Sequence, residues 1–377
     1  MSPPLRVLFD GWALIRHPGS PAALHLLAIL ENIPSEVQPV VAVPEAPPEW
    51  FPQFPIQIQE TANQFTWEQN SLPRLARRLD ADLLHLFSAS APLFGGSRTV
   101  VSPCSFDPIG MHGPLITDEG KESILNRARQ SIQLGGLARA RTLFLPHDLA
   151  TEELQTIFRC LPPLVHSSFT PTAQPDDHKR HNGSGGVRNE LHQLDLPDTY
   201  LLYHGPASTP AIIRLLNAWR WASNAIGNYH PLLLIGFNAA EQALFNELAQ
   251  PYGFSETVRV LPELSFPAIA MLYQGCTALF HPATEPLWGG PIRHALACGK
   301  PVVASHYLQT NRLVGPAAYL APENDHRAQG AALITVIVEE EVSEKLAQAA
   351  RQRAATWNGT AYSQALLAAY QKVTTSR

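Results

Sequence analysis

The stretch "TEPLWGGPIRHALACGKPVVAS", residues 284–305, reads as a loop, a short helix and a buried strand in quick succession. Two adjacent glycines, Gly289 and Gly290, stand directly before Pro291, and proline is favoured at the first position of a helix. Gly299 follows the helical run and suits a helix end. The free N–H groups of a helix start attract anions, and glycine lets the backbone approach one closely. We therefore consider an anion site here, with a plain strand-to-helix turn as the alternative.

The bulk properties of the chain limit both interpretations. With 377 residues, 45% of them apolar, the chain is long enough for two domains with sizeable cores. Only 16% of the residues are charged and the formal net charge is −5, which argues against a nucleic-acid partner. No stretch approaches the roughly 20 unbroken apolar residues of a membrane span. Four widely spaced cysteines show no zinc-ligand spacing, and the first residues do not resemble a signal peptide, so we expect a cytoplasmic protein without a metal ion.

Short apolar runs alternate with helical patterns along both halves of the chain. This alternation predicts parallel β-sheets with crossover helices. Residues 170–190 contain almost no apolar side chain and are interpreted as a linker or mobile loop, after which the alternation restarts. We predict an α/β protein with two doubly wound, Rossmann-like domains, residues 1–169 and 191–359. Ligands of such sheets bind at the carboxyl ends of the strands, here in the cleft between the domains.

Motifs of three other protein classes are missing from the sequence. The first strand ends in "FDGWALIRHPGSP", without the GxGxxG pattern of dinucleotide-binding proteins. The chain also lacks the GxxxxGK[ST] loop of P-loop ATPases and the GxSxG turn of α/β-hydrolases. These enzyme classes are therefore disfavoured.

The run "VRVLPELSFPAIAMLYQGCTALFHPATEPLWGGPIRHALACGKPVVAS", residues 258–305, resembles the donor domain of the group-one retaining glycosyltransferases, which have the GT-B fold. It shares with them a helix ending in a Leu-Tyr pair, a strand ending in proline, and the segment A-C-G-x-P-V-V-A-S. The runs "TYLLYHG", "HPLLLIGF" and "VGPAAYLAPENDHRA" resemble further parts of that domain, and the first half resembles the acceptor domain more loosely. The resemblance implies a GT-B-like fold, in which a final helix at 360–377 packs back on the N-terminal domain.

The resemblance also implies a function. Enzymes of this family move a sugar, here of the hexosyltransferase type, from a nucleotide-diphosphate donor to an acceptor. A cell-envelope or exopolysaccharide glycan, or a lipid-linked acceptor, fits this role, and a peripheral position at the inner face of the membrane is compatible with it. No cofactor is implied, because the nucleotide sugar is a substrate. The implied site residues are Glu285 as the catalytic carboxylate and, for donor binding, Gly205, Trp288, Gly289, Gly290, Arg293, His294 and Arg312.

Several positions depart from the family pattern. The two carboxylates of the family align with Pro286 and His294. Its Arg-Lys pair after the first donor-domain strand is missing, and the first cation there is Arg214. A histidine of the acceptor domain aligns near Cys104, which we interpret as a buried thiol, and the glycine-rich loop is reduced to Gly19. The alternative function is therefore a catalytically inactive pseudoglycosyltransferase that acts as a binding or partner subunit, with a protein partner.

Each departure has two interpretations. Arg293 and Arg312 would supply positive charge near the phosphates, Glu285 would reach inward if its loop shifted by one residue, and His294 would hydrogen-bond a ribose hydroxyl. The ordinary alternative leaves Arg293 exposed on its helix, Glu285 in solvent and His294 satisfied by a neighbour. A role in the cleft and a structural role are likewise open for the three histidines that end predicted strands, which are His85, His204 and His281.

Overall fold

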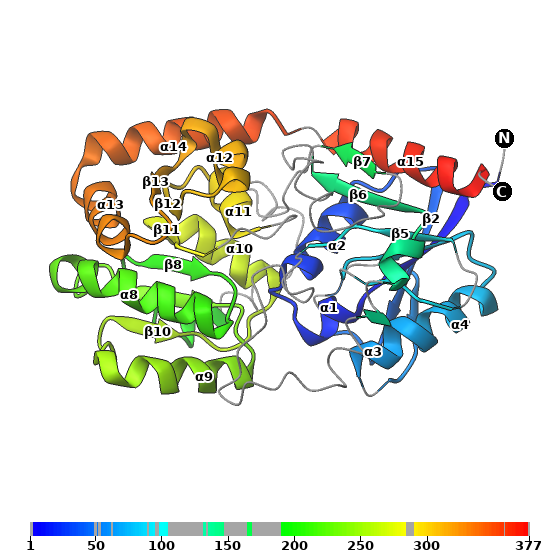
Figure 1. Ribbon diagram of the computed structural model, residues 1–377, viewed down its shortest axis with the longest axis horizontal. Coiled ribbons are helices and arrows are strands. Elements are labelled where there is room, and N and C mark those ends of the chain that lie inside the picture. Colours follow the sequence, from blue (N-terminus) through cyan, green and yellow to red (C-terminus); the bar gives the residue numbers. More distant parts are fainter. Residues whose placement is uncertain are drawn as a thin grey trace.

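The computed structural model describes residues 3–48, 51, 54–61, 63–88, 90–94, 98–104, 131–132, 135–146, 164–167, 190–283, 290–357 and 359–375. Within these residues the chain forms two α/β lobes, each built on its own parallel sheet (Figure 1). Most of the predicted linker, residues 170–189, lies outside the described residues, as does the loop at 284–289.

The N-terminal sheet has seven parallel strands in the order β3-β2-β1-β4-β5-β6-β7. They are β1 (Leu5–Asp10), β2 (Val37–Val43), β3 (Ile56–Ile58), β4 (Leu83–Leu86), β5 (Thr99–Val101), β6 (Thr142–Pro146) and β7 (Leu164–Ser167). The accompanying helices are α1 (Trp12–Arg16), α2 (Pro21–Glu31), α3 (Gln64–Thr66) and α4 (Leu72–Arg78), with a π-helical turn at Trp67–Ser71.

The C-terminal sheet has six parallel strands in the order β10-β9-β8-β11-β12-β13. They are β8 (Leu201–His204), β9 (Leu232–Ile235), β10 (Val258–Val260), β11 (Ala278–His281), β12 (Val302–Ser305) and β13 (Tyr319–Ala321). The helices are α8 (Thr209–Ile226), α9 (Ala239–Ala249), α10 (Phe266–Gly275), α11 (Pro291–Ala297), α12 (Leu308–Val314), α13 (His326–Val338) and α14 (Glu340–Ala355).

Each sheet separates two apolar clusters, because successive side chains of a strand point to opposite faces. In β1, Val7 and Phe9 belong to one cluster and Leu8 to the other. In β8, Leu202 belongs to one cluster and Leu201 to the other. Burial on both faces explains why the strands read as continuous apolar runs in the sequence. The prediction of an α/β protein with two doubly wound sheets is confirmed.

The strand order of the C-terminal sheet reverses between β8 and β11. Strands on either side of such a reversal are followed by connections that diverge, which leaves a crevice beyond their carboxyl ends. The last residues of these two strands are His204 and His281. The N-terminal sheet has the same reversal between β1 and β4, and β1 ends at Asp10.

In the sequence, the Ala-rich pattern near residues 328–356 predicts one long helix, but the structure has two helices, α13 and α14, which meet at Glu339. The backbone of Glu339 has φ −90 and ψ 92, which is not helical. Five β-branched residues, 334–338, precede it and lower the local helix propensity. Two acidic residues, Glu340 and Glu341, occupy the first turn of α14 and favour a new helix start there.

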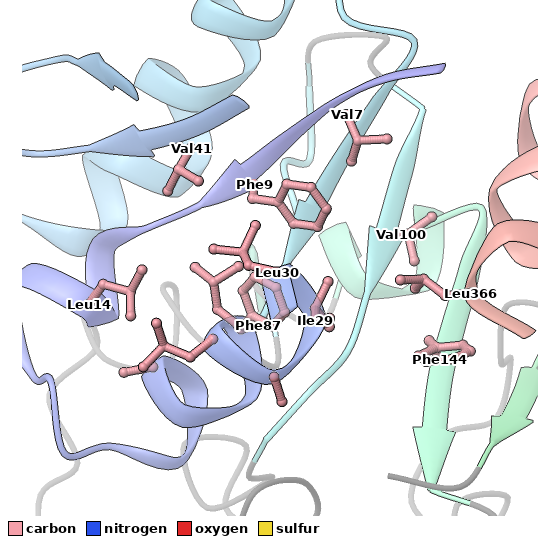
Figure 2. Close-up of a cluster of buried hydrophobic side chains, with 14 of the residues drawn as sticks. Val7, Phe9, Leu14, Ile29, Leu30, Val41, Phe87, Val100, Phe144 and Leu366 are labelled. Carbon is pink, nitrogen blue, oxygen red and sulfur yellow. The ribbon is translucent and has the colours of Figure 1, made fainter. Parts of the chain in front are cut away.

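The last helix of the chain, α15 (Gly359–Thr375), packs with the N-terminal sheet. It contacts β6 and β7, and Figure 1 shows it lying over those strands. Its Leu366 belongs to the same buried cluster as Phe9 and Phe144, and Figure 2 shows Leu366 beside Val100 and Phe144. Side chains from the end of the chain therefore complete the core of its first domain. Among the described residues, no helix combines the length and the apolar character needed to span a bilayer.

Truncation of Leu366 should destabilise the N-terminal domain. The side chain is fully buried, so Leu366→Ala leaves a cavity and should lower the free energy of unfolding by about 2 to 5 kcal/mol. Urea denaturation followed by tryptophan fluorescence measures this change. Gln364→Ala, an exposed position on the same helix, is the control and should change stability by less than about 0.5 kcal/mol. Equal effects of the two substitutions would contradict the packing of α15.

Candidate functional site

Helix α11 begins where the sequence indicated. Gly290 is its N-cap residue, with φ −67 and ψ 159, and Pro291 is the first helical residue. The helix ends at Ala297, and Gly299 takes a positive φ of 65 just beyond it, as a helix-ending glycine does. Three of the expected site residues lie outside the described residues, and these are Glu285, Trp288 and Gly289.

Arg293 is not exposed on its helix. Its side chain is 2% exposed, and its guanidinium carbon lies 5.3 Å from the ring centroid of Trp357. Trp357 belongs to the segment between α14 and α15, where the chain returns to the first domain. A cation–π contact of this buried kind is worth about 2 kcal/mol. The positive charge of Arg293 also contributes, after burial and the charge of His85, to lowering the pKa of His25 in α2. Arg293 is therefore placed close to the junction of the two domains.

His294 begins a row of buried rings that leads to the first domain. Its ring centroid lies 5.6 Å from that of Tyr273 in α10. Tyr273 Oη lies 2.9 Å from Nδ1 of His204, and Nε2 of His204 lies 2.6 Å from the carbonyl oxygen of Gly19. The structure thus connects a residue expected at the donor site with the remnant of the N-terminal glycine-rich loop.

Gly205 and Arg312 occupy different surroundings. Gly205 follows β8 and lies against the ring of Tyr203, so that a Cβ would stand 2.5 Å from Tyr203 Cζ. Arg312 is exposed in α12, and its backbone carbonyl accepts a hydrogen bond from Arg353 Nη2 at 2.8 Å. The close contact explains why position 205 requires glycine.

A pocket lies between the two domains. The loop before α2 lines one side, and the residues that follow β9 and β10 line the other. The pocket is small and partly open to solvent, and its lining residues are His17, Gly19, Ser20, Gly236, Phe237, Asn238, Glu263, Leu264 and Ile269. Two helix starts border the pocket, since Ser20 caps α2 and Asn238 caps α9.

Most residues of this pocket could not be predicted from the sequence, because the lining comes from three separate segments without a shared motif. Gly19 is the lining residue that the sequence already pointed to. One signal was available: Gly236 directly follows the apolar run of β9, and its φ of 81 favours glycine.

The histidines at the strand ends differ in their surroundings. His85 hydrogen-bonds Tyr370 Oη at 2.6 Å and Ser102 Oγ at 2.7 Å, both within the first domain. Burial lowers its pKa to about 3, so its ring is neutral and structural. His281 is fully buried, with its ring 6.1 Å from that of Tyr203. His204 forms a hydrogen bond that joins the two domains.

The first cation after β8 is already engaged. Arg214 pairs with Glu323 at 3.5 Å and donates a hydrogen bond to the hydroxyl of Tyr307. The Arg-Lys pair of the family therefore has no direct counterpart in the described residues at this strand end. Cys104 is 3% exposed, and burial raises the pKa of its thiol, as expected of a buried structural cysteine.

Two buried carboxyl groups lie at the carboxyl end of β1. Asp10 Oδ1 accepts hydrogen bonds from Trp67 Nε1 at 2.7 Å and from the backbone N–H of Trp12 at 3.0 Å. Glu68 Oε1 accepts one from Gln64 Nε2 at 2.8 Å. Burial raises the pKa of Asp10 to about 6, and burial together with the charge of Asp10 raises the pKa of Glu68 to about 7. Among the described residues, no cluster of three or more carboxylate, histidine or cysteine side chains could hold a metal ion.

Comparison with known proteins identifies the class of the second domain. Residues 212–353 match the family model of glycosyl transferases group 1. The O-antigen chain mannosyltransferase B of Escherichia coli is 28% identical over 127 residues, which are 33% of this chain and 33% of that protein. The chain thus matches about a third of the length of this curated relative. The predicted family resemblance is confirmed for the second domain.

Solved structures extend the likeness to the whole fold. WaaG, described as a glycosyltransferase involved in lipopolysaccharide biosynthesis, has a TM-score of 0.69 at 14% identity, covering 98% of this chain and 100% of its own. Sucrose-phosphate synthase from Thermosynechococcus elongatus scores 0.67 at 16% identity, covering 99% and 100%. HepE from Anabaena, solved with UDP and glucose, scores 0.64 at 17% identity, covering 97% and 99%. The protein has the GT-B fold, and its second domain is a group 1 glycosyl transferase domain.

The raised pKa of the Glu68 carboxyl predicts that part of the free energy of unfolding depends on pH. Because its pKa is raised from 4.5 to about 7, the folded state holds this proton more tightly than the unfolded chain between those values. The free energy of unfolding should therefore fall as pH rises through this window, with a slope of up to about 1.4 kcal/mol per pH unit. Glu68→Gln removes this contribution and should gain stability relative to wild type between pH 5 and 8.

Urea denaturation at several pH values measures the difference between Glu68→Gln and wild type. Titrating groups that do not interact with Glu68 cancel in that difference, including the buried histidines, whose lowered pKa values act in the opposite direction. Glu247→Gln, at an exposed position, serves as the control and should show no such trend. A pH-independent difference for Glu68→Gln would rule out the raised pKa.

Proposed function

We propose that this protein is a glycosyltransferase that moves a sugar from a nucleotide-diphosphate donor to an acceptor glycan or a lipid-linked acceptor. The observation that carries the proposal is the match of residues 212–353 to group 1 glycosyl transferases. That segment includes α11, and it also includes the residues after β9 and β10 that line the pocket between the domains. Two of the similar proteins named above are described as an O-antigen chain mannosyltransferase and as a glycosyltransferase involved in lipopolysaccharide biosynthesis, which favours a cell-envelope acceptor and a peripheral position at the inner face of the membrane.

The pocket suits one part of a nucleotide sugar. It is small, so it would hold only a small part of the donor, with the rest of the donor extending along the cleft. HepE was solved with UDP and with UDP-glucose, which makes a nucleoside diphosphate the first ligand to test. The proposed donor contacts remain those implied by the sequence: Gly205, Trp288, Gly289, Gly290, Arg293, His294 and Arg312.

In the transfer step the bond between the sugar C1 and the diphosphate oxygen breaks, and a bond between C1 and the acceptor oxygen forms. The nucleoside diphosphate leaves with the bond's electron pair, and the proton of the acceptor hydroxyl passes to the leaving diphosphate oxygen. Glu285 would place a carboxylate beside the transferred sugar. Preorganised groups that stabilise developing charge are each worth about 10² to 10³ in rate. The replaced carboxylates and the missing Arg-Lys pair support the second candidate, an inactive subunit that binds a nucleotide or a protein partner.

UDP binding should stabilise the folded protein by about 2.7 kcal/mol at a hundredfold excess over its dissociation constant. Gly19→Val should abolish this stabilisation, because a Cβ at Gly19 would lie 3.1 Å from Ile269 Cδ1 and the branched side chain would enter the pocket. Thermal unfolding with and without UDP measures the shift. The matched control is Gly135→Val, whose Cβ would lie 3.2 Å from Leu93 Cδ1, outside the pocket. If wild type shows no shift with UDP, GDP or ADP, the donor-binding proposal fails.

Turnover separates the two candidate functions. Incubation with a panel of nucleotide sugars should reveal at least one that is slowly hydrolysed or transferred. Glu285→Gln should lower that rate by about 10² to 10³ while leaving nucleotide affinity intact. A variant with the wild-type rate would remove Glu285 from the active site. Nucleotide binding without turnover of any donor would establish the inactive subunit instead.

A further inference from the structure

One hydrogen bond of His204 joins the two domains beside the pocket, and a second one holds its ring within the second domain. Its Nε2 lies 2.6 Å from the carbonyl oxygen of Gly19, and its Nδ1 lies 2.9 Å from Tyr273 Oη. His204 ends β8 of the second domain, whereas Gly19 lies in the loop before α2 of the first domain, 185 residues earlier in the chain. The side chain of His204 is 4% exposed, so water does not compete for these bonds.

The chemistry of the partners defines the direction of each hydrogen bond. A carbonyl oxygen can only accept, so Nε2 of His204 carries the ring proton and donates it to Gly19. Burial lowers the pKa of His204 to about 4, which leaves the ring neutral at pH 7. Nδ1 therefore accepts from the hydroxyl of Tyr273. The carbonyl of Gly19 therefore selects the tautomer, and the hydroxyl of Tyr273 supports that tautomer by donating to Nδ1.

Glycines bring the backbone of both domains close to the imidazole. Gly236 follows β9 with a φ of 81, and a Cβ there would lie 2.8 Å from Nε2 of His204. A Cβ at Gly19 would lie 3.4 Å from the Cα of Gly236 and 3.7 Å from Nε2 of His204. Both glycines also line the pocket. The position of the His204 ring and the shape of the pocket therefore depend on each other.

We propose that His204 is a positioning residue that fixes the loop of residues 17–20 against the second domain and thereby sets the closed form of the pocket. This loop supplies His17, Gly19 and Ser20 to the lining, and its hydrogen bond to His204 is lost when the domains separate. The inference that a nucleotide occupies the pocket rests on the proposed function. The closure of the two domains through His204 does not depend on that function.

Domain closure can be measured without any ligand. Single-molecule energy transfer between dyes at Arg78 and Glu256, exposed positions in the first and second domains, reports the distribution of open and closed molecules. His204→Leu removes the Nε2–H donor, so the carbonyl of Gly19 loses its hydrogen bond to the second domain. The ratio of open to closed molecules should rise on the order of fivefold to a hundredfold.

Two further variants separate positioning from simple destabilisation. Tyr252→Phe removes a hydrogen bond from the Tyr252 hydroxyl to Asn217 Oδ1 at 2.9 Å, and this bond lies within the second domain, outside the pocket lining. Its energy-transfer distribution should match wild type. His204→Gln keeps an N–H donor and should restore part of the closed population.

Nucleotide affinity gives a second measurement. The dissociation constant for UDP should rise in His204→Leu and stay unchanged in Tyr252→Phe. If His204→Leu does not fold, Tyr273→Phe decides, because loss of its hydroxyl removes the donor to Nδ1 and should weaken closure several-fold. An unchanged energy-transfer distribution in the folded variant overturns the role of His204. If UDP, GDP and ADP all fail to bind wild type, the proposed function falls, yet the energy-transfer comparison would still decide this inference.

Discussion

Two neighbouring parallel strands cannot be joined by a tight turn, and this constraint organises both domains. The chain must cross back to the starting edge of the sheet before each new strand begins, so the carboxyl ends of all strands lie at the same edge. In this chain the four strands beside the order reversals end at Asp10, Leu86, His204 and His281. The loops that follow the strand ends supply the pocket lining and the start of α11. Residues that share no local sequence motif therefore lie together at this edge, because the sheet topology places them there.

Much of this architecture could be predicted from the sequence, and the reasons are local. Strands buried on both faces appear as apolar runs, and Pro291 and Gly299 mark the two ends of α11. The break at Glu339 could not be predicted from the sequence, because a continuous Ala-rich pattern hides one non-helical residue. The burial of Arg293 could not be predicted either, because its partner Trp357 lies far along the chain, in the segment that returns to the other domain. Contacts between domains leave no periodicity that a sequence can display.

The candidate site relies more on neutral dipoles than on charge. Three strand-end histidines are buried, and two of them have pKa values lowered to about 3 and 4, so their rings are neutral. Arg214 is paired with Glu323, and Arg293 is enclosed beside Trp357. A diphosphate bound in the cleft would therefore meet oriented N–H groups to a greater extent than free cations. Such fixed dipoles need little reorganisation when charge develops nearby.

The packing of α15 on the first sheet bears on how the protein is made. Chains emerge from the ribosome beginning at the N-terminus, and domains usually fold in that order. Here Tyr362, Leu366 and Tyr370 follow the whole second domain along the chain, yet they complete the core around Phe9. The second domain can close its own core while the first still exposes the apolar surface that α15 covers. Until α15 has been synthesised, that surface can bind a molecular chaperone.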